Sequence, residues 1–388
     1  MVPRVAAASL RSLAKWAPVV VVTGPRQSGK STLCRMTFPS RPNVSLEPLD
    51  VREAVRTDPR GFLSEHQKKG VIVDEVQHVP ELLSYLQDEV DKNGKPGRFI
   101  LTGSQQFGLT QAVSQSLAGR AAMLELLPPS LSELRAFAGF RENLWDVIVR
   151  GSYPRIYDRK LQAREWLADY ISTYVERDVR QVLRVGDLRT FASFLRLAAG
   201  RTAQELNLST LGADAGVNHN TARAWMSVLR ASYVCFELPA WHTNVRKQLI
   251  KAPKVHFFDT GVVCYLLGIR SATELKTHPL RGAIFETWCV SELYKSFVHR
   301  RKRPRFFHYR DAKGLEVDLV SDEGARVRLF EMKSGATIAG DFFAGVDRLQ
   351  ALLETKSGVV RTHVVYGGST TSTRRTARVV PWNMLEPR

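Results

Sequence analysis

The segment from residue 19 to residue 32, VVVVTGPRQSGKST, constrains the fold of this chain more than any other segment. Four consecutive valines precede Gly24 closely, and Gly29 opens the tetrapeptide GKST. A run of β-branched residues predicts a buried strand, and the glycines after it predict a loop whose backbone N–H groups can surround an anion at the start of a helix. We therefore expect a strand, a phosphate-binding loop and a helix, in that order.

The side chains of this loop are suited to a nucleoside triphosphate. Lys30 can reach the β- and γ-phosphates, and the hydroxyl of Ser31 can be a ligand of Mg²⁺. The residues expected to contact the nucleotide are Gly24, Pro25, Arg26, Gln27, Ser28, Gly29, Lys30, Ser31 and Thr32. The alternative is a glycine-rich turn that arises by chance, but it does not explain the strand. An Asn-Lys-x-Asp element for guanine is missing from the sequence, so we expect ATP with Mg²⁺.

Two further apolar runs end in polar residues. The run at residues 70–75, GVIVDE, ends in Asp74, which is expected to complete the magnesium shell, and Glu75, which is expected to polarise the attacking water. The run at residues 98–104 ends in Ser104. If this strand lies between the other two in a parallel sheet, Ser104 is a candidate sensor of the γ-phosphate.

Arg120 allows two interpretations. It follows a polar, helix-like stretch over residues 105–118 and precedes an apolar strand over residues 121–127. If protomers form a ring, an arginine here lies at the subunit rim and can stabilise transition-state charge in a neighbour. It can equally be a cation that ends a helix and interacts with the helix dipole.

The order of phosphate loop, acidic strand, strand ending in Ser104 and Arg120 resembles the AAA+ class of ATPases. The tripeptide VPR at residues 2–4, followed by GPRQ at residues 24–27, resembles one prokaryotic branch that joins the ATPase to a C-terminal domain of unsettled function. The resemblance implies ATP hydrolysis, with Glu75, Ser104 and Arg120 as catalytic residues, and assembly into homo-oligomers.

The same resemblance extends beyond the ATPase core, so it spans most of the chain. It continues through GSYP at residues 151–154 and YVERD at residues 174–178, with Ser152 in place of an expected second glycine. A second ATPase sensor is expected between residues 130 and 184. Arg150, Arg155 and Arg177 are equal candidates.

Between residues 185 and 236 the pattern is helical. Helices are expected over residues 191–199 and 208–216, and a third, capped by Asn218, runs to about Ser232. This order predicts a helix-turn-helix. The residues expected to face the major groove are His219, Asn220, Thr221 and Arg223.

Two apolar strands follow, at residues 234–241 and 255–258, with a loop between them that contains the basic residues Arg246, Lys247, Lys251 and Lys254. This arrangement resembles a winged helix with a basic wing, so Arg246 and Lys247 are candidate DNA contacts. The same fold also serves protein contacts or lid packing in ATPases, and the sequence leaves that alternative open.

The last third of the chain predicts an α-β-β-β-α-β unit. It has a helix over residues 281–298, strands at 306–311, 316–320 and 326–333, a helix around 342–353 and a strand at 362–366. A turn at residues 322–324 brings Asp318 within a residue or two of Glu331. Strand alternation points Glu331 and Lys333 to one face and Met332 into the core.

Carboxylates at such a hairpin can hold a divalent cation while a lysine orients water for phosphodiester hydrolysis. Asp318 and the sequence EMK at residues 331–333 resemble the PD-(D/E)xK restriction-endonuclease-like superfamily, with Val317 in place of its proline. The resemblance implies Mg²⁺ or Mn²⁺ held by Asp318 and Glu331, with Glu286 as a third ligand and Lys333 as a catalytic residue. The alternatives are an exposed salt-bridged strand and a domain that has kept DNA binding without cleavage.

A net charge of +18 favours a polyanionic partner, although an arginine-rich genome would produce the same total. Seven of the basic residues lie between Lys295 and Arg310, interleaved with four aromatic residues and two histidines. This interleaving indicates either nucleic-acid contact or an ordinary solvated basic face.

The four cysteines, Cys34, Cys235, Cys264 and Cys289, have no paired spacing, so we expect small core residues in a reducing compartment. Arg11 and Lys15 interrupt the N-terminal apolar stretch, which argues against a signal peptide. No run approaches the roughly 18 apolar residues of a membrane span. A cytoplasmic protein is therefore expected.

The predicted fold class is α/β. We expect a P-loop AAA+ ATPase core with a parallel sheet at residues 1–129, a helical lid at 130–190, a winged-helix module at 191–258 and a restriction-endonuclease-like domain at 259–388. Together they favour a DNA-binding ATPase that couples hydrolysis to DNA remodelling or translocation, with a C-terminal nuclease. The alternatives are a nucleotide-dependent assembly switch with a silent nuclease-like domain and, ranked last, a transcription regulator.

Overall fold

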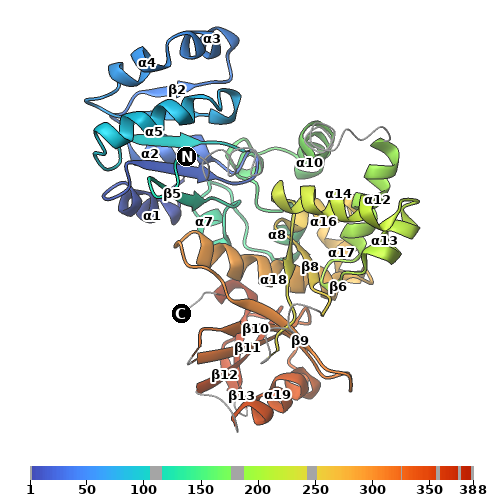
Figure 1. Ribbon diagram of the computed structural model, residues 1–388. Helices are drawn as coiled ribbons and strands as arrows, with labels where there is room; N and C mark the ends of the chain where they lie inside the picture. The colour runs from blue at the N-terminus through green and yellow to red at the C-terminus, as the bar shows by residue number, and fades with distance from the viewer. Residues whose placement is uncertain are drawn as a thin grey trace.

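The computed structural model describes residues 2–104, 116–175, 188–242, 251–324, 326–354, 359–374 and 377–385. Figure 1 shows an N-terminal α/β unit, a group of short helices, a helical unit with a small sheet, and a C-terminal α/β unit, with helix α18 between the first and the last. Among the described residues, no helix combines the length and apolar character that a membrane span needs.

The N-terminal unit is built on a five-stranded parallel sheet of order β2-β3-β4-β1-β5. Its strands are β1 (Val19–Thr23), β2 (Asn43–Ser45), β3 (Val71–Asp74), β4 (Phe99–Thr102) and β5 (Ala121–Glu125). Its helices are α1 (Ala6–Leu13), α2 (Lys30–Thr37), α3 (Leu49–Thr57), α4 (Pro59–Glu65), the 3₁₀ turn η1 (Val76–His78) and α5 (Leu82–Lys92). Strand β4 lies between β3 and β1, which is the arrangement that the expected role of Ser104 requires.

The valine run of β1 is buried on both faces because helices cover both sides of the sheet. Val19 and Val21 pack in a core with the α5 residue Leu86, whereas Val20 and Val22 pack with Leu10 of α1 and other residues on the opposite face. This burial holds β1 in the middle of the sheet, so the loop that follows it lies at the carboxyl edge of the parallel strands.

Short helices follow the ATPase sheet: α7 (Leu131–Leu134), α8 (Leu144–Arg150), α9 (Pro154–Asp158), α10 (Ala163–Tyr170) and the π-helical turn η2 (Ile171–Val175). The turn between α8 and α9 explains the GSYP sequence. A side chain on Gly151 would place its Cβ 2.3 Å from Asp259 Oδ1, and Gly151 has a φ of +71°. The backbone N and Oγ of Ser152 donate to Asp259 Oδ2 over 2.6 and 2.8 Å, and Lys295 Nζ lies 3.0 Å from Ser152 Oγ. The hydroxyl therefore ties this turn to α18, which a glycine could not do.

The next unit has the order α12 (Leu188–Gly200), β6 (Gln204–Glu205), α13 (Leu208–Asp214), α14 (His219–Ala231), β7 (Cys235–Leu238) and β8 (Lys254–Phe257). Its three strands form an antiparallel sheet of order β6-β8-β7. The predicted cap is present, because the Asn218 side chain accepts a hydrogen bond from Thr221 N over 2.9 Å. Trp225 packs against Phe191 and Phe194 at ring-centroid distances of 5.3 and 5.2 Å and joins α14 to α12.

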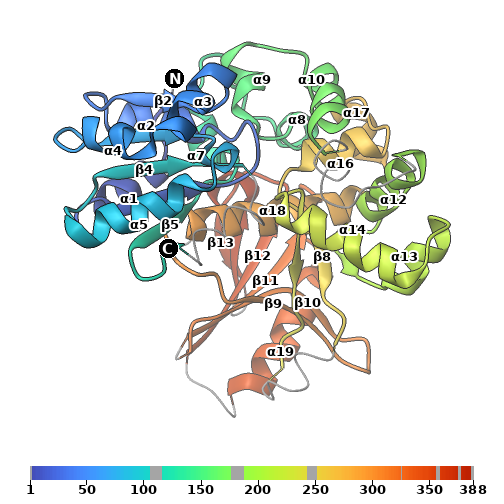
Figure 2. The same ribbon diagram turned by 45° about the horizontal axis from the view of Figure 1, so that its top comes forward.

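The C-terminal unit contains α16 (Thr260–Leu266), α17 (Ala272–Thr277), α18 (Arg281–Val298), β9 (Phe306–Arg310), β10 (Glu316–Asp322), β11 (Arg326–Lys333), η3 (Gly340–Phe343), α19 (Ala344–Glu354), β12 (Val359–Tyr366), β13 (Ser372–Arg374), β14 (Ala377–Pro381) and η4 (Trp382–Met384). The sheet order is β13-β14-β12-β11-β10-β9. Figure 2 shows α18 crossing one face of this sheet and α19 on the other. Strands β13 and β14 were not predicted.

The segment from Lys295 to Arg310 does not form the surface of interleaved basic and aromatic residues that was considered for nucleic-acid contact. Phe297, Phe306, His299 and His308 are at most 8% exposed, so they belong to the interior and do not form a stacking surface. Lys295 is also buried and pairs with Glu292 Oε1 over 2.9 Å. The charges that face solvent are those of the turn after α18, at residues 300–303 and 305, and that of Arg310 at the end of β9. The four cysteines are buried and unpaired, as predicted.

Candidate functional site

The loop between β1 and α2 adopts a conformation that its glycines permit. Gly24 has a φ of +144°, and a Cβ there would lie 2.1 Å from the backbone oxygen of Leu126 on the neighbouring strand connection. Gly29 has a φ of +93° and is the N-cap of α2. Both positions favour glycine because residues that carry a side chain rarely adopt these φ angles. The loop therefore directs its backbone toward the start of α2, where the helix dipole favours an anion.

Lys30 lies inside the loop that it is expected to serve. Its Nζ donates to the backbone oxygens of Gly24 and Pro25 over 3.1 and 2.9 Å, and the side chain is buried. Burial lowers the pKa of Lys30 to about 8, against the opposing charges of Glu75 and Asp74. An anionic phosphate entering the loop would offer this ammonium group a stronger partner than two carbonyl groups.

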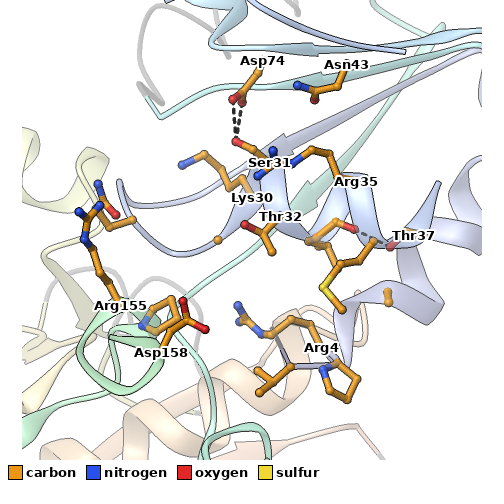
Figure 3. A pocket seen from close by; sticks show the side chains of 18 of the residues that line it. Arg4, Lys30, Ser31, Thr32, Arg35, Thr37, Asn43, Asp74, Arg155 and Asp158 are labelled. Carbon is orange, nitrogen blue, oxygen red and sulfur yellow. Dashed lines mark hydrogen bonds between the residues drawn. The ribbon is translucent and has the colours of Figure 1, made fainter. Parts of the chain in front are cut away.

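Ser31 and Asp74 face each other across the floor of the pocket (Figure 3). Ser31 Oγ lies 2.7 Å from both carboxylate oxygens of Asp74, and Thr102 also donates to Asp74. A hydroxyl and a carboxylate at this spacing are hard oxygen donors that fit Mg²⁺. The residues present therefore suit a magnesium ion bound together with a triphosphate.

Glu75 and Ser104 also meet at this edge of the sheet. Ser104 Oγ donates to Glu75 Oε2 over 3.3 Å, although the two residues follow different strands. Glu75 has a φ of +56°, so the chain turns sharply after β3 and presents the carboxylate beside the strand end. Ligand atoms of Glu47, Glu75 and His78 lie within 4.8 Å of one another. The structure thus brings the predicted hydrolytic carboxylate next to the predicted phosphate sensor.

The pocket around these groups has a volume of about 900 Å³ and is closed by two segments that come from elsewhere in the chain. One is the N-terminal segment, whose Arg4 donates to the backbone oxygens of Ser28 and Leu127 over 2.8 and 2.7 Å and pairs with Glu133 over 3.0 Å. The other is α9, which contributes Arg155 and Asp158 (Figure 3). The VPR tripeptide was noticed in the sequence, but its contact with the phosphate loop was not predicted.

Of the three arginines considered for a second sensor, Arg155 lines the pocket, Arg150 does not, and Arg177 lies outside the described residues.

Arg120 lies at the opposite edge of the sheet, where its backbone oxygen accepts from Val19 N at the start of β1. Its guanidinium group pairs with Asp91, with Nη2 and Oδ2 2.8 Å apart. It is therefore far from its own phosphate loop, and most of the helix-like stretch before it is outside the described residues.

The C-terminal sheet brings a second group of predicted residues together. Leu319 and Phe330 are register partners in the antiparallel pair β10-β11, which sets Asp318 opposite Glu331. Asp318 Oδ2 accepts from Met332 N over 2.7 Å, and Lys333 Nζ lies 2.7 Å from Glu331 Oε1. Burial, and next the charge of Asp318, raise the pKa of Glu331 to about 8. Glu331 Oε2 is buried and has no hydrogen-bond partner in the described part of the chain, which fits a cation at this position.

Lys254 corrects the expectation of an exposed residue in a basic wing. It is in β8, is only 3% exposed, and its Nζ lies 2.9 Å from Glu286 Oε1 and 2.7 Å from Glu316 Oε1. Burial lowers its pKa, but the charges of Glu286, Asp318 and Glu316 outweigh burial and raise the pKa above its usual value. Glu286, which was predicted as a metal ligand, is thus paired with an ammonium group, and burial raises its pKa well above the usual range.

The predicted DNA-contact residues of α14 lie at its first turns. Asn220 and Arg223 are exposed, and His219 and Thr221 are half-buried. Arg246 and Lys247 fall outside the described residues, so the structure says nothing about the predicted wing.

Three parts of the chain match known protein families. Residues 17–135 match a family described as AAA domain, and residues 141–273 and 281–385 match two domains of unknown function. Two curated relatives, Uncharacterized protein Rv2008c of Mycobacterium tuberculosis and Uncharacterized protein Mb2031c of Mycobacterium bovis, are each 32% identical over 342 residues, which is 86% of this chain and 74% of each relative. The chain belongs to this family of AAA-domain proteins. As an AAA-type ATPase, the protein binds and hydrolyses ATP.

Similar solved structures include the Walker-type ATPase PABY2304 of Pyrococcus abyssi, at 16% identity and a TM-score of 0.46 over 67% of this chain and 94% of that one. The RuvB Holliday junction branch migration motor of Thermotoga maritima has 16% identity and a TM-score of 0.28 over 63% of this chain and 93% of that one. Both scores are below 0.5, so neither likeness says anything about partners.

Proposed function

We propose that this AAA-domain ATPase acts on DNA, which it holds through α14 while ATP hydrolysis at the β1-α2 loop remodels or translocates it. Asn220 and Arg223 support this proposal most directly, because both are exposed in the first turns of a helix that follows a short turn. The order α12-β6-α13-α14-β7-β8 supports the proposal of a winged helix, in which the second helix of the helix-turn-helix would enter the major groove. The net charge of +18 favours the same partner.

In the ATPase cycle, each residue of the pocket has a part that follows from its position. Lys30 holds the β- and γ-phosphates, Ser31 and Asp74 hold Mg²⁺, and Glu75 orients the attacking water. Ser104 binds the γ-phosphate and, through its hydrogen bond with Glu75, links the position of that carboxylate to the presence of the phosphate. Arg155, on α9, lets the helices outside the sheet respond to the nucleotide. Arg120 acts in a neighbouring protomer of a homo-oligomeric ring, because it lies too far from its own loop.

The DNA contact can be tested with the double variant Asn220→Ala/Arg223→Ala. We expect its affinity for duplex DNA to fall by about tenfold or more, because two groove-facing side chains are lost and each good base contact contributes about 1–3 kcal/mol. Binding is measured by fluorescence anisotropy over a salt series. The matched control is Arg196→Ala, which removes an exposed arginine of the same unit that lies on α12 and not on α14. Equal duplex affinities for the wild type and the double variant would contradict the proposal.

The C-terminal unit supports a second part of the proposal, a metal-dependent nuclease. The order α18-β9-β10-β11-α19-β12 matches the α-β-β-β-α-β order of restriction-endonuclease-like domains. Asp318, Glu331 and Glu286 would hold Mg²⁺ or Mn²⁺, which supplies the Lewis acid, and Lys333 would orient the attacking water. With Glu316 these residues make a cluster of four carboxylates. The cluster faces the ammonium groups of Lys254 and Lys333, so in the fully ionised state it has a formal charge of −2, which suits one divalent cation.

The alternative is a nucleotide-dependent switch whose C-terminal unit binds a partner without cleaving. The pairing of Glu286 with Lys254 is the observation that favours it, because an ammonium group already neutralises part of the carboxylate cluster. Plasmid nicking with Mg²⁺ or Mn²⁺ separates the two functions. The nuclease proposal predicts nicking by the wild type and at least about a 100-fold slower rate for Lys333→Ala. Nicking by neither protein supports the switch.

A further inference from the structure

A second cavity, of about 310 Å³, lies on the face of the C-terminal sheet that carries Phe330 and Val365, which is the face on which α18 packs. Strands β11, β12 and β14 form its floor, and Arg135, together with Asn383, Met384 and Leu385, closes its rim. The basic residues that line it are Arg135, Arg328, Arg361, His363 and Arg378. Among the described residues that line this cavity none is a carboxylate, although both predicted sites described above are built around carboxylates.

Strand register forces these cations together. Arg328 of β11 is the direct partner of Arg361 on β12, and His363 of β12 is the partner of Arg378 on β14. Side chains paired on neighbouring strands interact, and like charges at such positions are destabilising. A face that sets arginine beside arginine on parallel strands is therefore more stable when an anion lies between them.

Two of the four arginines, Arg361 and Arg378, are available to such an anion, whereas the other two are paired with carboxylates. Arg135 pairs with Glu142 over 2.8 Å and Arg328 pairs with Glu323. In the described part of the chain, no carboxylate lies within 4.0 Å of the guanidinium group of Arg361 or Arg378, and both residues are exposed. The pKa of His363 is lowered to about 4 by burial and by the charges of Arg328, Arg378 and Arg361, which agrees with a positive potential in the cavity.

Apart from the amide of Asn383, the other described lining residues are apolar. Val365 and Val380 lie in the floor, and Met384, which is 58% exposed, lies at the rim. Guanidinium groups bind phosphate oxygens in a bidentate manner, and apolar side chains suit the face of a base. A volume near 310 Å³ is at the lower end of the roughly 300–1,000 Å³ typical of ligand pockets. It accommodates one nucleotide and not a stacked duplex.

We propose that this cavity, which we call the arginine pocket, binds a nucleotide of single-stranded nucleic acid, with the phosphodiester at Arg361 and Arg378 and the base against the apolar rim. A basic track leads to it. Arg300 and Arg135 line an adjoining small pocket, and Arg301 lies 5.5 Å from the ring of Trp16, which is 55% exposed. The site is separate from α14, so single-strand binding here does not depend on duplex binding there.

The test is the double variant Arg361→Gln/Arg378→Gln, in the full chain, with a fluorescent dodecathymidine strand and with a duplex as probes. Both residues are exposed, so the fold should tolerate the change. We expect single-strand affinity to fall by about tenfold and the slope of log affinity against log salt to decrease in magnitude by about 1.4, or about 0.7 for each lost phosphate contact. Duplex affinity should change by less than about threefold. The control with equal charge loss is Lys68→Gln/Lys69→Gln, at exposed positions of the ATPase unit.

The outcomes separate this inference from the proposed function. Single-strand binding that is unchanged in the arginine variant, or reduced equally in the lysine control, overturns the arginine pocket, whether or not α14 binds duplex DNA. Loss of single-strand binding in the arginine variant alone supports the pocket, even if Asn220→Ala/Arg223→Ala leaves duplex binding intact. A wild type that binds no single strand also overturns it.

Discussion

Replacing Lys30 with alanine is expected to lower ATP turnover by at least about 100-fold. The ammonium group is buried in the phosphate loop, where its charge is positioned for the β- and γ-phosphates. We also expect weaker ATP binding, because the change removes a positive charge from a pocket that contains Asp74 and Glu75. Phosphate release measures turnover, and titration with a fluorescent ATP analogue measures binding.

The matched control is Lys92→Ala, which removes an exposed lysine at the end of α5 that pairs with Asp88. It should keep turnover close to that of the wild type. If Lys30→Ala and Lys92→Ala hydrolyse ATP at equal rates, the loop between β1 and α2 is not the hydrolytic site.

Replacing Lys254 with methionine is expected to destabilise the C-terminal unit by about 3–5 kcal/mol, because removing one partner of a buried ion pair leaves an uncompensated charge. Glu286 and Glu316 would lose their shared cation beside Asp318 and Glu331. For a unit of this size, the unfolding temperature should fall by roughly 10 °C. Differential scanning calorimetry without divalent metal measures the change.

A double variant gives the control. Lys254→Met/Glu286→Leu removes the ammonium group and the more buried of its two carboxylates, and leaves Glu316, whose side chain is 38% exposed to solvent. Apolar replacement of a buried pair is often neutral, so the double variant should recover most of the lost unfolding temperature. A Lys254→Met protein that unfolds within about 2 °C of the wild type would mean that the pair contributes little. Added Mn²⁺ should partly restore Lys254→Met, since a divalent cation can replace the ammonium charge among these carboxylates.

The ATPase site was largely predictable because its signals are local. The four valines, the glycine spacing and the strand ending in Asp74 each specify a short segment, and parallel strands end at one edge of a sheet. The hairpin of Asp318 and Glu331 was predicted for the same reason, since a short turn fixes the pairing of its two strands.

The errors and omissions concern contacts between distant segments. Lys254 precedes an apolar strand and follows basic residues, so nothing near it in sequence indicates that Glu286 and Glu316 receive its side chain in the interior. The arginine pocket joins three strands, one of them β14, whose short apolar run was not recognised. The contact of Arg4 with Ser28 likewise depends on how α1 packs on the sheet.

The central claim, that hydrolysis at Lys30 is coupled to DNA, is tested most directly by ATP turnover of the wild type with and without DNA. The account predicts that DNA changes the rate severalfold, that the change weakens as salt rises because counterions compete for the phosphates, and that Asn220→Ala/Arg223→Ala reduces it. A turnover that is the same at every DNA and salt concentration, in a protein that shows no salt-dependent DNA binding, would contradict the claim.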